Sequence, residues 1–394
     1  MEVAFMLVLL DRCCGLDIHK ELIFACCLSG DSDSPTAVHS QFVTNQNGLS
    51  ELCNWLKNLD CVHVAMESTG VYWRPVYEAL EDQFPDCEAI VINAQHFHNL
   101  PGRKSDVKDA EWIATMYRHG LLSKSFVPAK EFRTMREVSR LVRKAVSERI
   151  GQINRMEKFL QIRDIKLSSV VHDVTGKSSR ALLDLLVQKG HLTLPDIESV
   201  CGRLKASAQE IRDAVKGTLP IYDRKLLSRI LYELDFYDSE IKELRDILLE
   251  LAEPYSVQLK QLCSIPGINV DSALAIMAEI SATPQTDFAS SEKLCSWAGL
   301  VPRNDESAGK IISNRILPGN PFIKSILCQC AWVSVYSRNS VFHDWFWKRQ
   351  ARIGRKKAII AVARKMLALC YKLLTSGEFY DPVVALSPNQ SPVQ

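Results

Sequence analysis

The sequence predicts an α/β domain followed by a mainly helical remainder. Up to residue 120, β-rich apolar runs alternate with helical periodicities, two long helical patterns follow, and shorter helical patterns end the chain. With 394 residues the chain is too long for one ordinary core, so we expect two or three domains.

The first 120 residues predict eight elements in a fixed order. Two apolar runs, 13–19 and 22–28, flank the charged pair Lys20–Glu21, which is typical of a β-hairpin. The pattern then predicts a strand over 36–43, a helix over 48–59, a strand over 61–66, a helix over 75–80, a strand over 88–92 and a helix over 106–117. This β-β-β-α-β-α-β-α order is that of the ribonuclease-H-like, RuvC-like fold.

The remainder predicts a long helical connector and a separate C-terminal domain. A basic helix is expected over 131–163 and a second helix over 224–251. Apolar residues recur in the second helix at alternating steps of three and four, as in a coiled-coil seam: Leu227, Ile230, Leu234, Tyr237, Ile241, Leu244, Leu248 and Leu251. A helix packed in a globular core would also fit this pattern.

Residues 167–220 give no pattern that assigns a fold. We expect a catalytic domain over 12–125, a helical coiled-coil region over 126–255 and a C-terminal domain over 256–385.

Positive charge is concentrated in two segments although the net charge is only +2. Lys and Arg exceed Asp and Glu by 11 between residues 303 and 372, and by 5 between residues 131 and 166. A solvated basic face would explain a single helix, but the excess over 70 residues favours a surface that binds nucleic acid.

Cysteine usage indicates a reducing compartment. The thirteen cysteines form no CxxC pair, and the adjacent pairs Cys13–Cys14 and Cys26–Cys27 fall on expected strands as small buried hydrophobes. We therefore expect a cytoplasmic protein without a disulfide framework or a zinc site. The apolar residues 1–10 are too short to span a bilayer, and no membrane segment is expected; they are a strand lead-in or a start-site artefact.

Four carboxylates occupy positions that this topology brings together. Asp17 lies on the first expected strand and Glu67 at the end of the fourth, so neighbouring strands would place them side by side. Asp106 and Asp109 are three residues apart on the following helix and share a face. Convergent carboxylates hold the two metal ions of phosphodiester chemistry, and magnesium prefers such oxygen ligands.

Each acid also has a structural interpretation when it is taken alone. Asp17 could cap a turn, and Asp106 could be a helix N-cap with Asp109 in the first turn. Four acids at convergent positions favour the metal site. Three histidines could be proposed as metal ligands: His19, His96 and His98. His96 and His98 lie in an expected loop without an acidic or cysteine partner at zinc spacing, and we expect nucleic-acid contacts or surface positions for the histidines rather than metal ligation.

The C-terminal region contains a helix-hairpin-helix-like turn and an unusual serine. The run Ile265-Pro266-Gly267-Ile268-Asn269 precedes a helical pattern, as in hairpins whose backbone N–H groups bind phosphate. Ser307 follows in a loop with small neighbours and with Arg303, Lys310 and Arg315 nearby. Such a serine is either a nucleophile that needs activation or a residue of a phosphate-binding loop.

These segments together resemble the DEDD transposases of bacterial insertion sequences, family one-hundred-and-ten, which are bridge-RNA-guided recombinases. The resemblance covers nearly the whole chain except 167–220, and the segments that carry it are 15–20, 66–73, 93–110, 265–279 and 299–320. Ala308 departs from the glycine or serine of many relatives.

The resemblance implies roles for individual residues. It gives Asp17, Glu67, Asp106 and Asp109 the task of holding two Mg²⁺ ions, and it makes Ser307 the nucleophile that links covalently to a DNA phosphate. It further implies donor and target DNA, a non-coding guide RNA and a homo-oligomer (dimer or tetramer) with composite active sites. Nucleic-acid contacts are expected from six cations: Arg103, Lys104, Arg303, Lys310, Arg315 and Lys324.

The sequence therefore predicts a magnesium-dependent, RNA-guided DNA transposase or recombinase that cuts and rejoins DNA through a serine–phosphate intermediate. Two alternatives remain open. A junction-resolving nuclease would use the same carboxylates with water as the nucleophile. A non-catalytic RNA-binding protein would not need the four acids.

Overall fold

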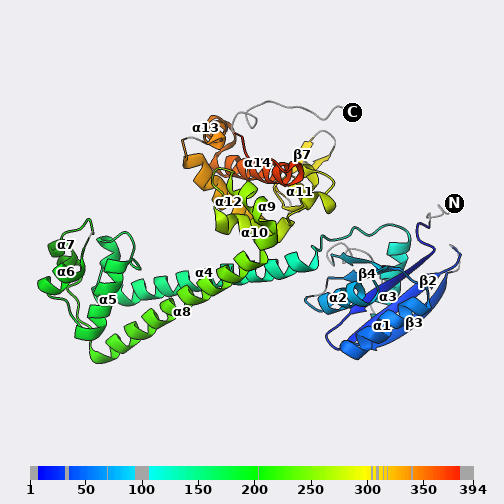
Figure 1. The fold of residues 1–394 in the computed structure, drawn as a ribbon, viewed down its shortest axis with the longest axis horizontal. Helices are drawn as coiled ribbons and strands as arrows, with labels where there is room; N and C mark the ends of the chain where they lie inside the picture. Colours follow the sequence, from blue (N-terminus) through cyan, green and yellow to red (C-terminus); the bar gives the residue numbers. More distant parts are fainter. Residues whose placement is uncertain are drawn as a thin grey trace. The chain divides into compact units, whose positions relative to one another are not determined.

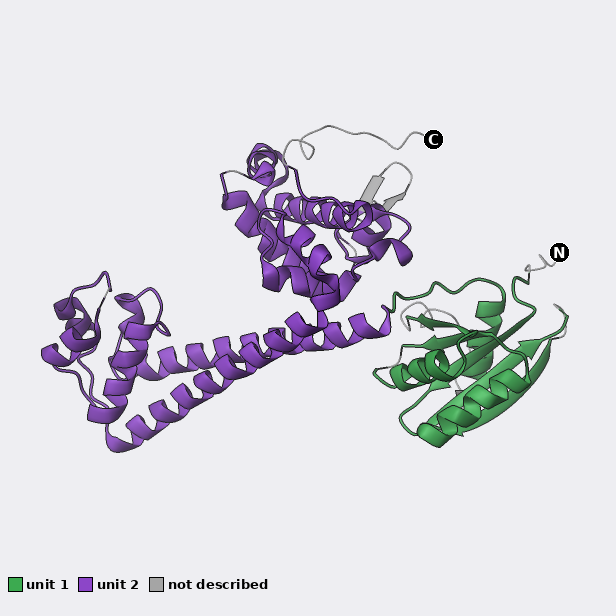
Figure 2. Cartoon of the chain, in the orientation of Figure 1, with its two compact units in different colours: residues 1–127 green, residues 128–394 purple. Residues whose placement is uncertain are grey.

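A computed structural model gives the fold of the chain. It describes residues 8–31, 35–68, 70–93, 106–202, 204–302, 305–307, 310–313, 315–316, 318–338 and 340–381, and for residues 106, 107, 305–307 and 310–312 the backbone alone. The chain divides into two compact units, Met1–Val127 and Pro128–Gln394 (Figure 2). The three-domain division at 12–125, 126–255 and 256–385 stays a prediction.

The first unit is a mixed five-stranded sheet in the order β3-β2-β1-β4-β5. Its strands are β1 (Arg12–Ile18), β2 (Leu22–Ser29), β3 (Thr36–Val43), β4 (His63–Glu67) and β5 (Glu88–Ile92). The first three strands pair antiparallel, whereas β4 runs parallel to both β1 and β5. The predicted ribonuclease-H-like order of elements is confirmed, and the predicted bounds of the β3 and β5 strands match those observed.

Helices cover both faces of this sheet, as Figure 1 shows. Helices α1 (Gln46–Asn58) and α2 (Trp73–Gln83) pack on one face, where Leu16 and Ile18 join a core with Leu52 and Leu80. Helix α3 (Asp106–Arg118) packs on the other face, where Cys13 and Cys26 contact its small residues. Successive strand residues point to opposite faces, so β1 contributes to both cores.

Gly15 is the point at which α3 comes closest to the sheet. A Cβ atom added at Gly15 would overlap the carbonyl oxygen of Ala110 and would lie 2.5 Å from the amide nitrogen of Ala114. The neighbouring thiol of Cys13 donates to the carbonyl oxygen of Ala114 at 3.3 Å. The backbone of α3 therefore packs directly on β1, which only a residue without a side chain allows.

The second unit begins with two long paired helices, α4 (Lys130–Gln161) and α8 (Ile221–Leu251). One ion pair joins Arg149 of α4 to Asp238 of α8, and a second joins Arg163, just after α4, to Asp223 of α8. A later position in the first segment therefore meets an earlier position on α8. The two helices are therefore antiparallel, and Figure 1 shows them side by side.

The predicted seam of α8 faces α4 of the same chain. Leu227, Ile230, Leu234 and Leu248 are buried, whereas the seam residues between the last two are half-buried. The sequence left open whether this helix pairs within or between chains, and the structure provides a partner within the chain.

Residues 167–220, which the sequence could not assign, form a small helical cap. Its elements are the 3₁₀ turn η2 (Leu167–Ser169) and the helices α5 (Lys177–Lys189), α6 (Leu194–Val200) and α7 (Ala208–Ala214). Reciprocal side-chain hydrogen bonds start α6 at Thr193 and Asp196, and α7 at Ser207 and Glu210. The cap shares a core with the adjacent ends of α4 and α8, including Leu182, Ile211 and Leu227 in one cluster.

The rest of the second unit is mainly helical and is built around α14. Its elements are η3 (Glu253–Tyr255), α9 (Ser256–Cys263), α10 (Val270–Ile280), η4 (Pro284–Thr286), α11 (Ser291–Trp297), β6 (Asp305–Ser307), β7 (Lys310–Ser313), α12 (Pro321–Tyr336), α13 (Val341–Ile353) and α14 (Arg355–Ser376). Helix α14 packs against α9, α11, α12 and α13, and its buried residues include Val362, Met366 and Cys370. The predicted mainly helical region after the first unit is confirmed.

The hairpin between α9 and α10 packs against a neighbouring helix. Gly267 has a φ of +92°, and a Cβ atom there would lie 2.5 Å from the carbonyl oxygen of Cys330 in α12. The side chain of Asn269 caps α10 by accepting a hydrogen bond from the Ser272 amide at 2.9 Å. The turn that resembles a helix-hairpin-helix thus starts α10 and packs closely against α12.

A buried carboxylate joins α10 to both α4 and α12. Glu279, with 1% of its surface exposed, accepts hydrogen bonds from Arg140 Nε at 3.0 Å and from Asn320 Nδ2 at 2.7 Å. Arg136 lies 3.3 Å from the same carboxylate and donates to the Glu279 carbonyl oxygen at 2.6 Å. Burial lowers the pKa of Arg136 to about 10, with Glu279 opposing that shift and Arg140 adding to it. We call these four residues the Glu279 cluster.

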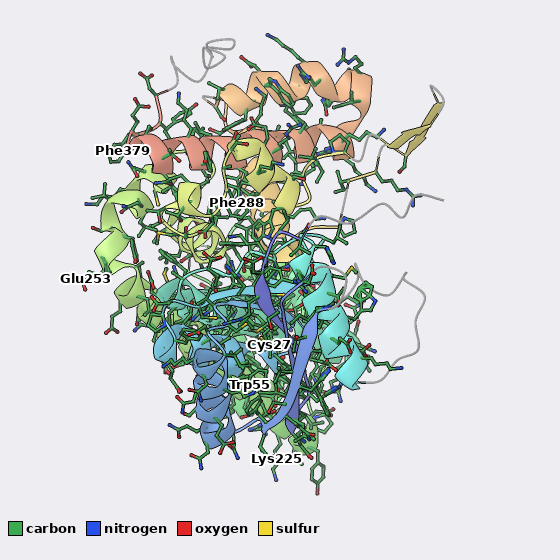
Figure 3. All side chains as sticks on the ribbon, turned by 90° about the vertical axis from the view of Figure 1, so that its right-hand side faces the viewer. Cys27, Trp55, Lys225, Glu253, Phe288 and Phe379 are labelled. Atoms are coloured by element: carbon green, nitrogen blue, oxygen red, sulfur yellow. The ribbon has the colours of Figure 1, made fainter. Side chains whose placement is uncertain are left out.

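The cysteines are unpaired and those of the sheet are deeply buried. Cys13, Cys14, Cys26 and Cys27 are all buried free thiols, and Figure 3 shows Cys27 among the strands. Burial raises the pKa of Cys13 and of Cys26 to about 12. The prediction that these residues act as small hydrophobes is confirmed. None of the helices among the described residues has both the length and the apolar character that crossing a membrane requires.

Replacing Gly15 by alanine should destabilise the first unit by about 1–3 kcal/mol, because the new Cβ forces α3 off β1. Denaturant unfolding followed by circular dichroism measures this change. Gly151→Ala in α4 is the control, since a Cβ there meets nothing within 4 Å and should stabilise that helix by roughly 0.5–1 kcal/mol. A wild-type free energy of unfolding for Gly15→Ala would contradict the packing argument.

Glu279→Ala should destabilise the second unit by about 3–5 kcal/mol, because it leaves Arg136 buried without its counter-charge. Glu279→Gln retains the volume and part of the hydrogen bonding, so its loss should be smaller. The exposed Glu250→Ala in α8 is the control and should change stability by no more than about 0.5 kcal/mol. Equal unfolding midpoints for Glu279→Ala and Glu250→Ala would show that the cluster contributes nothing.

Candidate active site

Asp17 and Glu67 lie at the same end of two neighbouring parallel strands. The register of β1 on β4 pairs Gly15 with Ala65 and Leu16 with Met66, so the next positions along the two strands are Asp17 and Glu67. Both strands end within one residue of these acids. The carboxyl ends of parallel strands thus bring the two side chains to one edge of the sheet.

Both acids share the face of the sheet that α3 covers. Asp17 is two residues after Gly15, and Glu67 is two residues after Ala65, which packs with Ile113 of α3. Asp109 immediately precedes Ala110, whose backbone meets β1 at Gly15. The close approach at Gly15 therefore brings the first turns of α3 to the strand ends that carry the two acids.

The electrostatics of Asp17 report this convergence. Burial raises the pKa of the Asp17 carboxyl; the charge and hydrogen bond of His19 oppose the shift, and the carboxylates of Asp109 and Glu67 add to it. The carboxyl is 7% exposed, and its Oδ2 atom lies 3.1 Å from Nε2 of His19. Carboxylates from β4 and α3 thus both act on the carboxyl of Asp17 in β1.

Glu67 and Asp109 have no counter-ion from the protein within the part of the chain that the structure describes. Both are half-buried. Asp106 is the first residue of α3, one turn before Ala110, and its side chain lies outside the described residues. The described carboxyls therefore form an acidic group with no Lys or Arg partner among the described residues.

The donor set has the chemistry that a hard divalent cation requires. Carboxylate oxygens are the preferred ligands of magnesium, and clustered carboxylates without cationic partners gain from a bound cation. Among the described side chains, no three His, Cys, Asp or Glu residues stand close enough to hold an ion as they are placed. The residues fit a divalent cation in type and in position on the fold.

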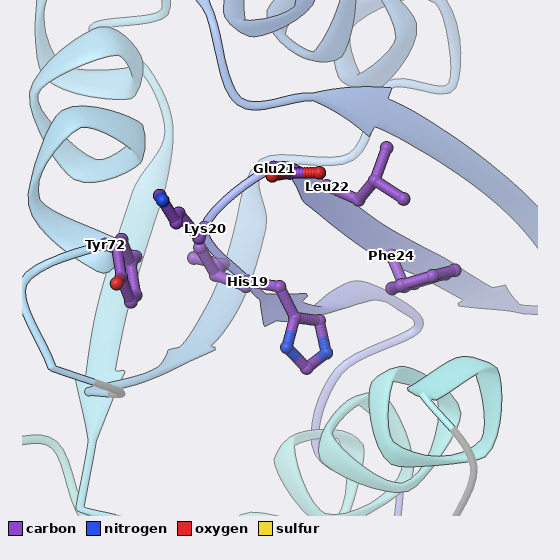
Figure 4. Close-up of a pocket in the computed structure, with 7 residues that line it drawn as sticks. His19, Lys20, Glu21, Leu22, Phe24 and Tyr72 are labelled. Carbon is purple, nitrogen blue, oxygen red and sulfur yellow. The ribbon is translucent and has the colours of Figure 1, made fainter.

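An open depression lies beside Asp17 on the same unit. It is lined by Ile18, His19, Lys20, Glu21, Leu22, Phe24 and Tyr72. Figure 4 shows these side chains, which come from the end of β1, the β1–β2 turn, β2 and the residue that precedes α2. His19 contacts Phe24 edge to face, with ring centroids 5.9 Å apart. The depression thus combines aromatic rings, one lysine and the histidine that binds Asp17.

Ser307 lies in a β-ribbon rather than in the loop that the sequence predicted. Strand β6 pairs antiparallel with β7, and Ser307 is opposite Lys310 across the turn. The side chains of Ser307 and Lys310 lie outside the described residues. Short strands of three and four residues between small residues carry too little periodicity for a strand prediction, which explains the difference.

The expected nucleic-acid contacts fall partly within the described chain. Arg315 is exposed, and its amide donates to Ser313 Oγ at 3.3 Å. Lys324 is half-buried on α12. Five of the named residues lie outside the described residues altogether: His96, His98, Arg103, Lys104 and Arg303.

Sequence reasoning missed two features near the candidate site residues. His19 was considered as a metal ligand or a surface residue, whereas it hydrogen-bonds Asp17. The Glu279 cluster joins α10 and α4 to Asn320, which caps the start of α12. Its sequence signal is a single acid at the end of the apolar run Ala273-Leu274-Ala275-Ile276-Met277-Ala278.

Two family models match the chain. One, described as a transposase, matches residues 14–163, which include all four acids. The other, described as a transposase of the IS116/IS110/IS902 family, matches residues 259–346, which include Ser307.

Curated relatives agree with these matches. The chain is 23% identical over 381 residues to the pilin gene-inverting protein of Moraxella bovis, covering 93% of this chain and 97% of that protein. The same protein from Moraxella lacunata gives the same identity and coverage. A Sinorhizobium fredii protein with the provisional name transposase y4pF/y4sB is 29% identical over 185 residues, which cover 45% of this chain and 47% of that protein. The chain belongs to the IS110 family of DEDD transposases.

Proposed function

We propose that this transposase is a magnesium-dependent, RNA-guided recombinase that cuts and rejoins DNA through a covalent serine–phosphate link. The observation that carries the proposal is the placement of Asp17 and Glu67 at the ends of neighbouring parallel strands, beside the first turns of α3 that carry Asp109. The charges of Asp109 and Glu67 both raise the pKa of Asp17. Acids that share no sequence neighbourhood converge when they share a cation or a substrate.

Asp17, Glu67, Asp106 and Asp109 would hold two Mg²⁺ ions, which polarise the scissile phosphate and lower the pKa of the attacking hydroxyl. Asp17 provides a ligand oxygen from a rigid strand. His19 binds Asp17 Oδ2 and thereby fixes the rotation of the carboxyl group. The backbone contact at Gly15 keeps the acids of α3 close to Asp17.

Ser307 would be the nucleophile. Its Oγ forms a bond to phosphorus as the P–O bond to the released strand breaks; the hydroxyl proton leaves to solvent, and the released oxygen takes up a proton. The reverse reaction with another strand end restores the phosphodiester without a high-energy cofactor. Lys310 and Arg303 would stabilise the negative charge on the phosphoryl oxygens.

The relatives support cutting coupled to rejoining. The Moraxella proteins are named for inverting a gene, and an inversion needs every cut strand to be joined again. Covalent capture satisfies that need because the phosphodiester energy is conserved. A water nucleophile would give hydrolysed ends, as a junction-resolving nuclease does.

Donor and target DNA, a non-coding guide RNA and a second copy of the chain complete the proposed complex. Positive charge in the 131–166 and 303–372 segments supports polyanion partners. Exposed apolar side chains on the paired helices, among them Leu141 and Ile150 on α4 and Phe236 on α8, support a homo-oligomer (dimer or tetramer).

Asp17→Asn and Glu67→Gln should each abolish DNA strand cleavage in magnesium and weaken Mn²⁺ binding measured by calorimetry. The loss should exceed the roughly 10–100-fold that follows removal of an outer-shell partner. Glu51→Gln on the exposed face of α1 is the control and should retain both properties. Wild-type cleavage and Mn²⁺ affinity in either site variant would refute the assignment of the carboxylates.

Ser307→Ala should lose both strand exchange and a denaturant-resistant protein–DNA adduct while it still binds DNA, since one oxygen atom is removed. Gel analysis of trapped reactions with labelled DNA measures the adduct. Ser313→Ala, whose hydroxyl accepts from the Arg315 amide, is the matched control and should retain the adduct. An adduct in Ser307→Ala, or normal cleavage without any adduct, would favour water as the nucleophile.

A further inference from the structure

Helices α13 and α14 carry a concentrated positive surface. Between residues 345 and 377 the sequence contains no acidic residue. Eight of the nine exposed cations on these helices lie between residues 348 and 365: Lys348, Arg349, Arg352, Arg355, Lys356, Lys357, Arg364 and Lys365. We call them the α13–α14 basic surface. No ion pair joins any of them to an acid among the residues that the structure describes.

Aromatic rings hold three of these cations in place. The Arg349 guanidinium and the Lys365 amine lie 4.6 Å and 5.2 Å from the ring centroid of Trp345. The Arg355 guanidinium lies 4.8 Å from the ring centroid of Trp332 and donates to the hydroxyl of Tyr336. Cations that are ordered on ring faces lose less side-chain entropy when they bind an anion.

The cations are also crowded against one another. Burial lowers the pKa of Lys365, and the charge of Arg349 lowers it further. Like charges held near one ring repel, and a bound anion relieves that repulsion. Apart from the charge of Glu292 near Arg364, the basic surface lacks counter-charge from its own chain. Elsewhere the chain supplies such a partner, as Asp238 does for Arg149 on α4 and Asp223 for Arg163 just after α4.

We propose that the α13–α14 basic surface binds the phosphodiester backbone of duplex DNA. The proposal rests on the proposed recombinase function, which requires the protein to hold duplex DNA. Residues 348–365 lie outside both segments that the family models match, so the assignment comes from the charge and ring contacts of this chain. Figure 1 shows the two helices that carry the surface.

The dimensions fit a duplex. From Arg355 to Lys365 the rise along α14 is about 15 Å, given ~1.5 Å per residue. Duplex DNA carries one negative charge per ~1.7 Å of its axis, so a segment of that length presents about nine charges. Exposed Lys and Arg side chains along a helix contact phosphates without reading bases, so we expect binding that is independent of DNA sequence.

The test measures how strongly the full-length protein binds a random-sequence duplex, by fluorescence anisotropy over roughly 50–200 mM salt. The variant Arg352→Glu/Lys356→Glu should bind at least ~10-fold more weakly, and the magnitude of its log K against log salt slope should fall by about 2. Lys225→Glu/Lys242→Glu makes the same charge change on exposed positions of α8, and Figure 3 labels Lys225. This control should retain the wild-type slope.

Three outcomes would overturn the proposal: a wild-type slope in Arg352→Glu/Lys356→Glu, an equal loss in the control, or weaker binding of a structured RNA with unchanged DNA binding. Circular dichroism checks that each variant is folded. If Arg352→Glu/Lys356→Glu is unfolded, the charge-neutral variant Arg352→Gln/Lys356→Gln is measured in its place. Metal-dependent cleavage by the wild-type protein is measured in parallel. If the wild-type protein cuts DNA while the slope of log K against log salt is unchanged in the variant, the DNA-binding role of the basic surface is wrong and the proposed recombinase function is not affected.

Discussion

The direct contact between the α3 backbone and Gly15 is the constraint on which the candidate active site depends. It sets the distance between a helix and a sheet at a position where no side chain separates them. Two residues further along β1 is Asp17, and one residue before the contact on α3 is Asp109. A close-packed interior transmits such a displacement, so a small shift of α3 would separate the acids of the two elements.

The second unit uses arginine in two opposite environments. In the Glu279 cluster two guanidiniums are held against one buried carboxylate, and the low dielectric makes that arrangement stable only while all partners are present. On α13 and α14, Arg349 and Arg355 face solvent and contact aromatic rings rather than acids. The first arrangement fixes α10, α4 and the start of α12 together, whereas the second leaves positive charge free for an external anion.

The sequence predicted the sheet, its order and the long helices because each has a period that is repeated several times. Strands β3 and β5 match the predicted bounds for this reason. Helices α6 and α7 have seven residues each, too few for a period, although the caps Thr193–Asp196 and Ser207–Glu210 were a usable signal. The convergence of Asp17 with Glu67 followed from strand order. The His19 and Glu279 contacts could not be predicted, since they join residues through side-chain geometry and through distant parts of the chain.

Folding protects the buried thiols of the sheet from oxidation. Only the thiolate reacts, and burial that raises the pKa of Cys13 and Cys26 to about 12 leaves almost none at neutral pH. Unfolding exposes all thirteen thiols to solvent, where their pKa values are those of free cysteine. None of the thirteen is in a disulfide in the native state. Any disulfide that then forms is non-native, so refolding requires a reductant. In air the lifetime of the active protein is therefore set by its rate of unfolding.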